Sequence, residues 1–122
     1  MDLEKQLESR IRLGRLFDLY SGLLTERQRK AFELHDLSDL SLQEIAETMG
    51  GSRQGVYDLV QRARQRLLEL EASLGFEARL ESRRKAIRTI LSRYSSELPS
   101  PFVKEMEEAL AENAEEAMER DV

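Results

Sequence analysis

The sequence predicts an all-α fold with a helix-turn-helix core, long flanking helices and a C-terminal helical extension. Apolar residues recur at helical spacing through most of the chain, and only two of its 122 residues are prolines. Strand-like alternation is found nowhere. The central stretch, residues 40–55 (LSLQEIAETMGGSRQG), reads as a short helix, a tight glycine turn and the start of a second helix. The remaining helices are placed around this motif.

Two helices are expected ahead of the motif. The first is long and amphipathic, and its apolar positions are Leu3, Leu7, Ile11, Leu16, Phe17, Tyr20 and Leu24. Thr25 and Gln28 then form the capping box of the second helix. This helix should run to about Leu37, and the side chains expected to be buried are Ala31, Phe32, Leu34 and Leu37.

Local signals define both helices of the motif. Ser41 and Glu44 form a capping box, and a hydrophobic staple joins Leu40 to Ile45. The apolar stripe is Leu42, Ile45, Ala46 and Met49, where small Ala46 suits a close helix crossing. Gly50 and Gly51 should end this helix, because glycine alone takes a positive φ without steric cost. Ser52 should cap a longer helix that ends near Leu74 and Gly75.

The C-terminal part is expected to hold two more helices. A fifth helix covers about residues 76–94, and residues 95–100 form a linker. Ser100 is the expected N-cap of a sixth helix, with Pro101 at its first position. Beyond Ala111 we expect fraying or disorder, since few side chains there could be buried. The predicted division is a domain over residues 1–96 and an acidic C-terminal helix and tail over residues 97–122.

Composition argues against catalysis, metals and membranes. The chain has no cysteine and a single histidine, His35, so a zinc site is implausible. We find no catalytic constellation and no phosphate-binding loop, because Gly50 and Gly51 lack a following lysine and a preceding strand. No cofactor and no enzymatic activity are expected. No apolar run approaches the roughly 20 residues that cross a bilayer, and no signal peptide is recognisable, so the expected location is the cytoplasm.

The candidate binding residues lie on two helices. On the second helix of the motif they are Arg53, Gln54, Tyr57, Gln61 and Arg62, which lie off its apolar stripe. On the fifth helix they are Arg79, Arg83 and Lys85, as contacts to a nucleic-acid backbone. A plain helical hairpin without a recognition role remains an alternative. The basic fifth helix could equally be a solvated face, or contact an acidic partner such as the chain's own tail. Asp58 would repel phosphate unless it pairs with Arg62.

The charge is unevenly distributed along the chain. The net charge of −5 includes −2 over residues 25–73, +4 over residues 74–96 and −7 over residues 97–122. A dedicated DNA-binding protein usually has a basic footprint. The motif lacks one, and this weakens the interpretation as a DNA-binding protein.

Several runs of the sequence together resemble one family. They are LFDLY (residues 16–20), LLT with RQR (23–25 and 27–29), DLSL with EIAE (39–42 and 44–47) and SRQ with VYD (52–54 and 56–58). In this combination the chain resembles the YlxM family, small bacterial proteins with a motif similar to region 4 of sigma factors, over about residues 10–84. Two positions depart from the family pattern: Gly51 replaces a valine or similar residue, and Gly55 replaces an alanine.

The resemblance implies a cytoplasmic, helical protein that dimerises and modulates the signal recognition particle pathway, through the particle's RNA or its GTPase protein. The expected function is therefore a non-enzymatic regulator or adaptor of that pathway that binds RNA or DNA through the helix-turn-helix. Alternatives are a sequence-specific DNA-binding transcription regulator and a purely protein-binding homodimer. A homodimer is also expected because the first and fourth helices carry more apolar surface than one three-helix unit can bury.

Overall fold

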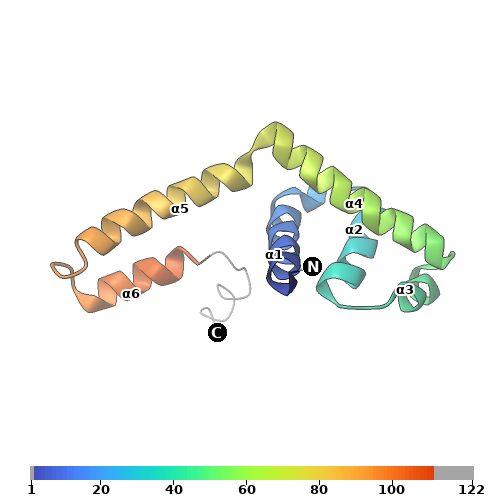
Figure 1. The fold of residues 1–122 in the computed structure, drawn as a ribbon, viewed down its shortest axis with the longest axis horizontal. Coiled ribbons are helices and arrows are strands. Elements are labelled where there is room, and N and C mark those ends of the chain that lie inside the picture. The colour runs from blue at the N-terminus through green and yellow to red at the C-terminus, as the bar shows by residue number, and fades with distance from the viewer. Residues whose placement is uncertain (1, 112–122) are drawn as a thin grey trace. The chain divides into compact units, whose positions relative to one another are not determined.

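The computed structural model describes residues 2–111, and all regular secondary structure in this range is helical (Figure 1). The all-α prediction is therefore confirmed. The chain divides into two compact units that meet between Gly75 and Phe76. In this division by contacts the fifth helix groups with the sixth, and the division into domains at residue 96 stays a prediction.

The first unit is built around one long helix. Its elements are α1 (Leu3–Tyr20), a 3₁₀ turn (Ser21–Leu23), α2 (Glu26–Phe32), a π-helical segment (Glu33–Leu37), α3 (Leu42–Met49) and α4 (Arg53–Leu74). Helices α1, α2 and α3 all pack against α4 (Figure 1). Helices α3 and α4, joined by the glycine turn, are the two helices of the predicted motif.

The predicted caps are present in this unit. Thr25 and Gln28 form one capping box and Ser41 and Glu44 another. The pKa of the Glu44 carboxyl lies below its ordinary value, because this carboxylate is hydrogen-bonded to Ser41. The Ser41 backbone amide has the larger effect and the Ser41 side chain the smaller one. At α4 the Ser52 side chain accepts a hydrogen bond of 3.0 Å from the Gly55 amide. These contacts satisfy backbone donors that would otherwise have no partner at the helix starts.

The glycine turn depends on a backbone that glycine alone adopts readily. Gly50 has φ 85° and Gly51 has φ 99°. An L side chain at either position would be strained although nothing crowds it within 4 Å. A valine at position 51 would therefore be strained in this turn. Gly55 differs, since an added Cβ there would only press on the Ser52 Oγ at 3.2 Å.

Two apolar clusters lie along α4. The cluster towards its C-terminal half contains Leu16, Phe17, Tyr20, Leu24, Phe32, Ala63, Leu67 and Leu70. Within it the rings of Phe17 and Phe32 stack with centroids 4.7 Å apart. The cluster at the helix-turn-helix contains Ala31, Ile45, Ala46, Val56 and Val60. Because Ala46 is buried at the crossing of α3 and α4, its small side chain lets the two helices approach.

One prediction about a buried side chain is wrong, and the apolar side of α1 is only partly covered. The second helix changes from α to π geometry at Glu33, and Leu37 is 54% exposed instead of buried. In α1 only the C-terminal half packs on the core, while Leu3, Leu7 and Ile11 are 82%, 58% and 48% exposed. These three side chains follow one another at every fourth residue, so they form a stripe on one side of the helix. We call it the α1 stripe.

Over residues 76–111, the second unit contains two helices, α5 (Phe76–Arg93) and α6 (Ser100–Ala109), which form a hairpin (Figure 1). Leu91 and Leu110 are its most buried side chains, and Arg88 Nη2 donates a 2.9 Å hydrogen bond to the Leu110 carbonyl oxygen. The predicted cap of α6 is wrong, because Pro99 is the N-cap and Ser100 is already helical. The fraying expected beyond Ala111 concerns residues 112–122, which lie outside the described residues.

Candidate nucleic-acid interface

Helix α4 presents a polar face next to the glycine turn. Val56, Val60 and Ala63 are buried against the other helices. The five predicted residues lie off this stripe: Arg53, Gln54, Tyr57 and Arg62 are exposed and Gln61 is half-buried. At Tyr57, 45% of the surface is accessible. A helix that turns about 100° per residue places these side chains across the solvent-facing half of α4.

Arg53 and Arg62 lie on opposite edges of this face. They are nine residues apart, which is about two and a half turns and about 14 Å along the helix axis. The centre of the face lies between them and is formed by the amides of Gln54 and Gln61. The α4 face therefore has neutral amide donors and acceptors at its centre and one arginine at each edge.

Asp58 lies on the same face, and its hydrogen-bond partner is Gln54. Its Oδ1 accepts a 3.1 Å hydrogen bond from Gln54 Nε2. The bond holds the Gln54 amide against α4. Because glutamine is neutral, the negative charge of Asp58 stays uncompensated on the face and would oppose a nearby phosphate.

The predicted basic residues of α5 do not share one face. Arg79 and Arg83 are four residues apart and neighbours on the helix surface, but Lys85 lies about 200° further round from Arg83. Arg84 is half-buried, and Arg88 binds the Leu110 carbonyl. Arg79 also lies over the Phe76 ring, 5.6 Å from its centroid. The cations surround α5 and are partly engaged within their own unit.

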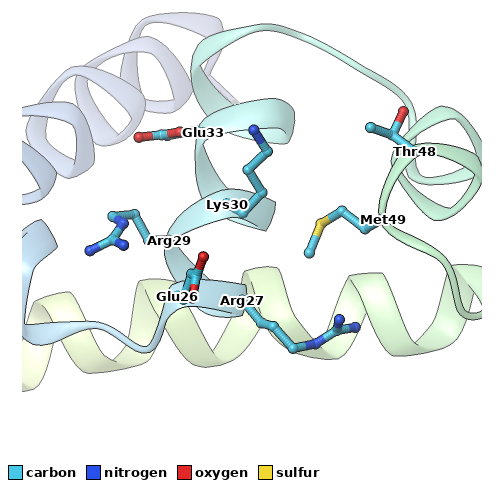
Figure 2. A pocket seen from close by; sticks show the side chains of 7 residues that line it. All are labelled: Glu26, Arg27, Arg29, Lys30, Glu33, Thr48 and Met49. Atoms are coloured by element: carbon cyan, nitrogen blue, oxygen red, sulfur yellow. The ribbon is translucent and has the colours of Figure 1, made fainter.

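A hollow between α2 and α3 was missed by the sequence analysis. It has a volume of about 380 Å³, and its lining residues are Glu26, Arg27, Arg29, Lys30, Glu33, Thr48 and Met49 (Figure 2). We call it the α2–α3 hollow. Met49 is the last residue of α3, so the hollow adjoins the turn that leads into α4. The run of cations in residues 27–30 was visible in the sequence, but nothing local indicated that α3 would lie beside it.

Within the described residues, the acidic side chains and His35 do not come together as a metal-binding group. No group of three or more His, Asp or Glu side chains within residues 2–111 could hold a metal ion. His35 is half-buried, and its Nδ1 lies 3.0 Å from the Leu40 carbonyl oxygen. It therefore acts as a structural contact to the loop ahead of α3. Within the same range, no helix combines the length and apolar character needed to cross a membrane.

Two capped helices joined by a glycine turn, with a polar face on the second helix, make this a helix-turn-helix protein. The chain belongs to the UPF0122 family, the YlxM/p13-like helix-turn-helix proteins, whose match covers residues 7–113. The resemblance found in the sequence is thereby confirmed.

Relatives from several bacteria are similar over most of their length. A UPF0122 protein of Halalkalibacterium halodurans is 43% identical over 84 residues, which is 69% of this chain and 77% of the relative. One of Clostridium botulinum is 41% identical over 85 residues, covering 70% and 78%. One of Bacillus cereus is 40% identical over 91 residues, covering 75% and 83%. The similarity thus extends well beyond the short motif.

Proposed function

We propose that this protein is a non-enzymatic regulator or adaptor that binds nucleic acid through α4. The observation that carries the proposal is the pair of cations at the margins of the α4 face. Within residues 2–111, the side chains of Arg53 and Arg62 make no hydrogen bond or ion pair with the rest of the protein. Cations that the fold does not use are available for phosphates, whose contacts supply most of the affinity in nucleic-acid complexes.

The pathway assignment rests on the family resemblance alone. We propose that the target belongs to the signal recognition particle, as its RNA or its GTPase protein, and that the protein acts in the bacterial cytoplasm. The net charge of −2 over residues 25–73 weakens the alternative of a dedicated DNA-binding regulator, because such a protein usually has a basic footprint. Gln54, Tyr57 and Gln61 would provide the contacts that distinguish sequences or shapes, since amides pair with base edges and a tyrosine ring stacks on bases.

The test measures binding of the purified full chain to three labelled probes by fluorescence anisotropy. The probes are the particle's RNA, an unrelated structured RNA of the same length and a 20-base-pair DNA duplex. We expect the particle's RNA to bind best, with an affinity that falls steeply as salt increases. Arg53→Ala should weaken binding by about 1–3 kcal/mol where it reads a base edge. Arg62→Ala should weaken all probes alike and lower the salt slope by about one.

Asp58→Asn is a control whose expected effect on affinity is opposite to that of the two arginine variants. Removing its charge should tighten nucleic-acid binding, because one repulsive term is lost. The nucleic-acid proposal would be abandoned if no probe bound and Asp58→Asn instead abolished capture of a protein partner. Equal affinity for all three probes would retain nucleic-acid binding and remove the assignment to the signal recognition particle.

A second candidate, a homodimer that binds only protein, is favoured by the α1 stripe. Leu3, Leu7 and Ile11 leave an apolar surface that the described part of the protein does not cover. Such a protein would show little dependence of affinity on salt. The salt titration above therefore separates the two candidates.

A further inference from the structure

We propose that Arg27 and Lys30, in the α2–α3 hollow, each contact a backbone phosphate of the nucleic acid whose bases or grooves α4 contacts. This inference rests on the proposed function and extends its binding surface from α4 to α2. It adds two residues that the sequence analysis did not select.

The first argument is that these cations are not used by the fold. Within the part of the chain that the structure describes, neither the Arg27 guanidinium nor the Lys30 ammonium has a hydrogen-bond or ion-pair partner. Two other cations of the first unit do have structural roles. Arg64 makes two 3.0 Å hydrogen bonds to Asp36, and Arg10 lies 3.3 Å from Asp39. Arg27 and Lys30 are exposed and unengaged instead.

The second argument is the position of the hollow. Thr48 and Met49 form its α3 side and directly precede Gly50, Gly51 and the start of α4. Arg53 is the first helical residue after that turn. A nucleic acid engaged by the first turn of α4 therefore runs close to the end of α3, where the hollow opens. Backbone contacts of this kind fix the register of the protein on its target without reading sequence.

The third argument is size and orientation. About 380 Å³ is more than ten times the volume of roughly 30 Å³ that one water takes in the liquid, so the hollow has room for a phosphodiester group.

Figure 2 shows Arg27 extending on the same side of α2 as Met49, whereas Arg29 extends to the opposite side, as does Glu33. Because Arg29 and Glu33 extend to that opposite side and have opposite charges, the remaining charged lining residues are Arg27, Lys30 and the carboxylate of Glu26, which opposes an anion. A net positive balance remains, and it provides the cationic surface that the helix-turn-helix itself lacks.

The experiment uses the full chain with the 20-base-pair duplex and the particle's RNA, titrated between about 50 and 200 mM salt. Arg27→Gln and Lys30→Gln should each weaken binding about five- to eightfold at roughly 0.1–0.15 M salt, because one phosphate contact releases about 0.9 counterions on B-DNA. Each should lower the salt slope by about 0.9 on DNA and about 0.7 on single-stranded RNA. The ratio of affinities between probes should not change, since the contact carries no sequence information.

Arg29→Gln is the matched control. It removes the same charge from the same helix, but its side chain points away from Met49, so affinity and slope should stay near the wild-type values. Glu26→Gln should act in the opposite direction and tighten binding. Thermal unfolding of each variant checks that the fold is retained.

The outcomes separate this inference from the proposed function. If Arg53→Ala and Arg62→Ala weaken binding while Arg27→Gln and Lys30→Gln behave like Arg29→Gln, α4 binds nucleic acid and the hollow does not. If the wild-type protein binds neither probe, the proposed function fails and this inference fails with it. If all three α2 variants weaken binding equally, the effect is one of general charge, and the hollow is not a phosphate site.

Discussion

At the scale of single residues, Arg64 is a cation of α4 that serves the fold. Its guanidinium binds Asp36 of the π-helical segment through two hydrogen bonds of 3.0 Å, in the fork geometry that suits arginine and a carboxylate. The Asp36 side chain is only 7% exposed and that of Arg64 is 32% exposed. The pair therefore links α4 to the segment that follows α2, only two residues from Arg62.

We predict that Arg64→Leu lowers the free energy of unfolding by about 1–3 kcal/mol, because a nearly buried carboxylate loses its partner. The effect stays below that of a fully buried pair, since about a third of Arg64 is in water and screens the interaction. Urea denaturation at neutral pH provides the measurement. Arg66→Leu is the matched control on the same helix: its pair with Glu69 is 4.0 Å long and half exposed, so stability should hardly change. Equal losses for the two variants would contradict a specific role of the Asp36 pair.

At the scale of elements, the glycine turn sets the angle at which α4 leaves α3. Gly51 has φ 99°, and nothing lies within 4 Å of a Cβ built on it. Any penalty for a side chain there therefore comes from the backbone and not from a clash. Gly14, inside α1, also has open space around its Cβ but carries no positive φ. The two glycines form a pair that separates conformational strain from crowding.

We expect Gly51→Ala to destabilise the protein by about 1–3 kcal/mol, the usual cost of holding a side chain in a sparsely populated backbone region. Gly14→Ala should instead stabilise it by about 0.5–1 kcal/mol, because alanine is the better residue inside a helix. Thermal unfolding of both variants measures the contrast. A stable Gly51→Ala protein would mean that the turn has a second conformation, one that an L residue can adopt without strain.

At the scale of the whole molecule, the α1 stripe and the C-terminal half of α4 differ in what covers them. Leu67 is fully buried by α1 and α2, whereas Leu7 is 58% exposed. An apolar stripe of this kind on a helix surface usually marks an interface. We retain the homodimer as a proposal and assign it to this stripe.

Sedimentation equilibrium at tens of micromolar, the concentration range suited to modest interfaces, should show a dimer. Leu7→Gln should shift the protein to a monomer without loss of helicity. Leu23→Gln is the matched control, because Leu23 is 57% exposed but lies in the 3₁₀ turn at the far end of α1. A monomeric wild-type protein, or identical behaviour of both variants, would exclude an interface at the stripe.

The sequence by itself determined the features that depend on neighbours within about four residues. The capping boxes at Thr25 and Ser41, the glycine turn and the stop at Gly75 were all predicted, because each depends on bonds or dihedral angles inside one segment. Burial of Ile45, Ala46 and Val56 followed from the helical spacing of apolar residues. The family could be recognised for the same reason, since its motif is a local pattern.

Only the tertiary structure decided what each helix surface contacts. Periodicity could not reveal that Leu7 and Leu37 stay exposed, because both continue an apolar pattern and differ from Leu67 only in lacking a helix opposite. The pairing of Arg64 with Asp36 spans 28 residues, and the α2–α3 hollow joins residues about 20 apart. Such contacts depend on how helices cross, and this is set by packing against α4 and not by any single segment. For that reason Arg27 looked like an ordinary surface residue in the sequence and became a candidate binding residue in the fold.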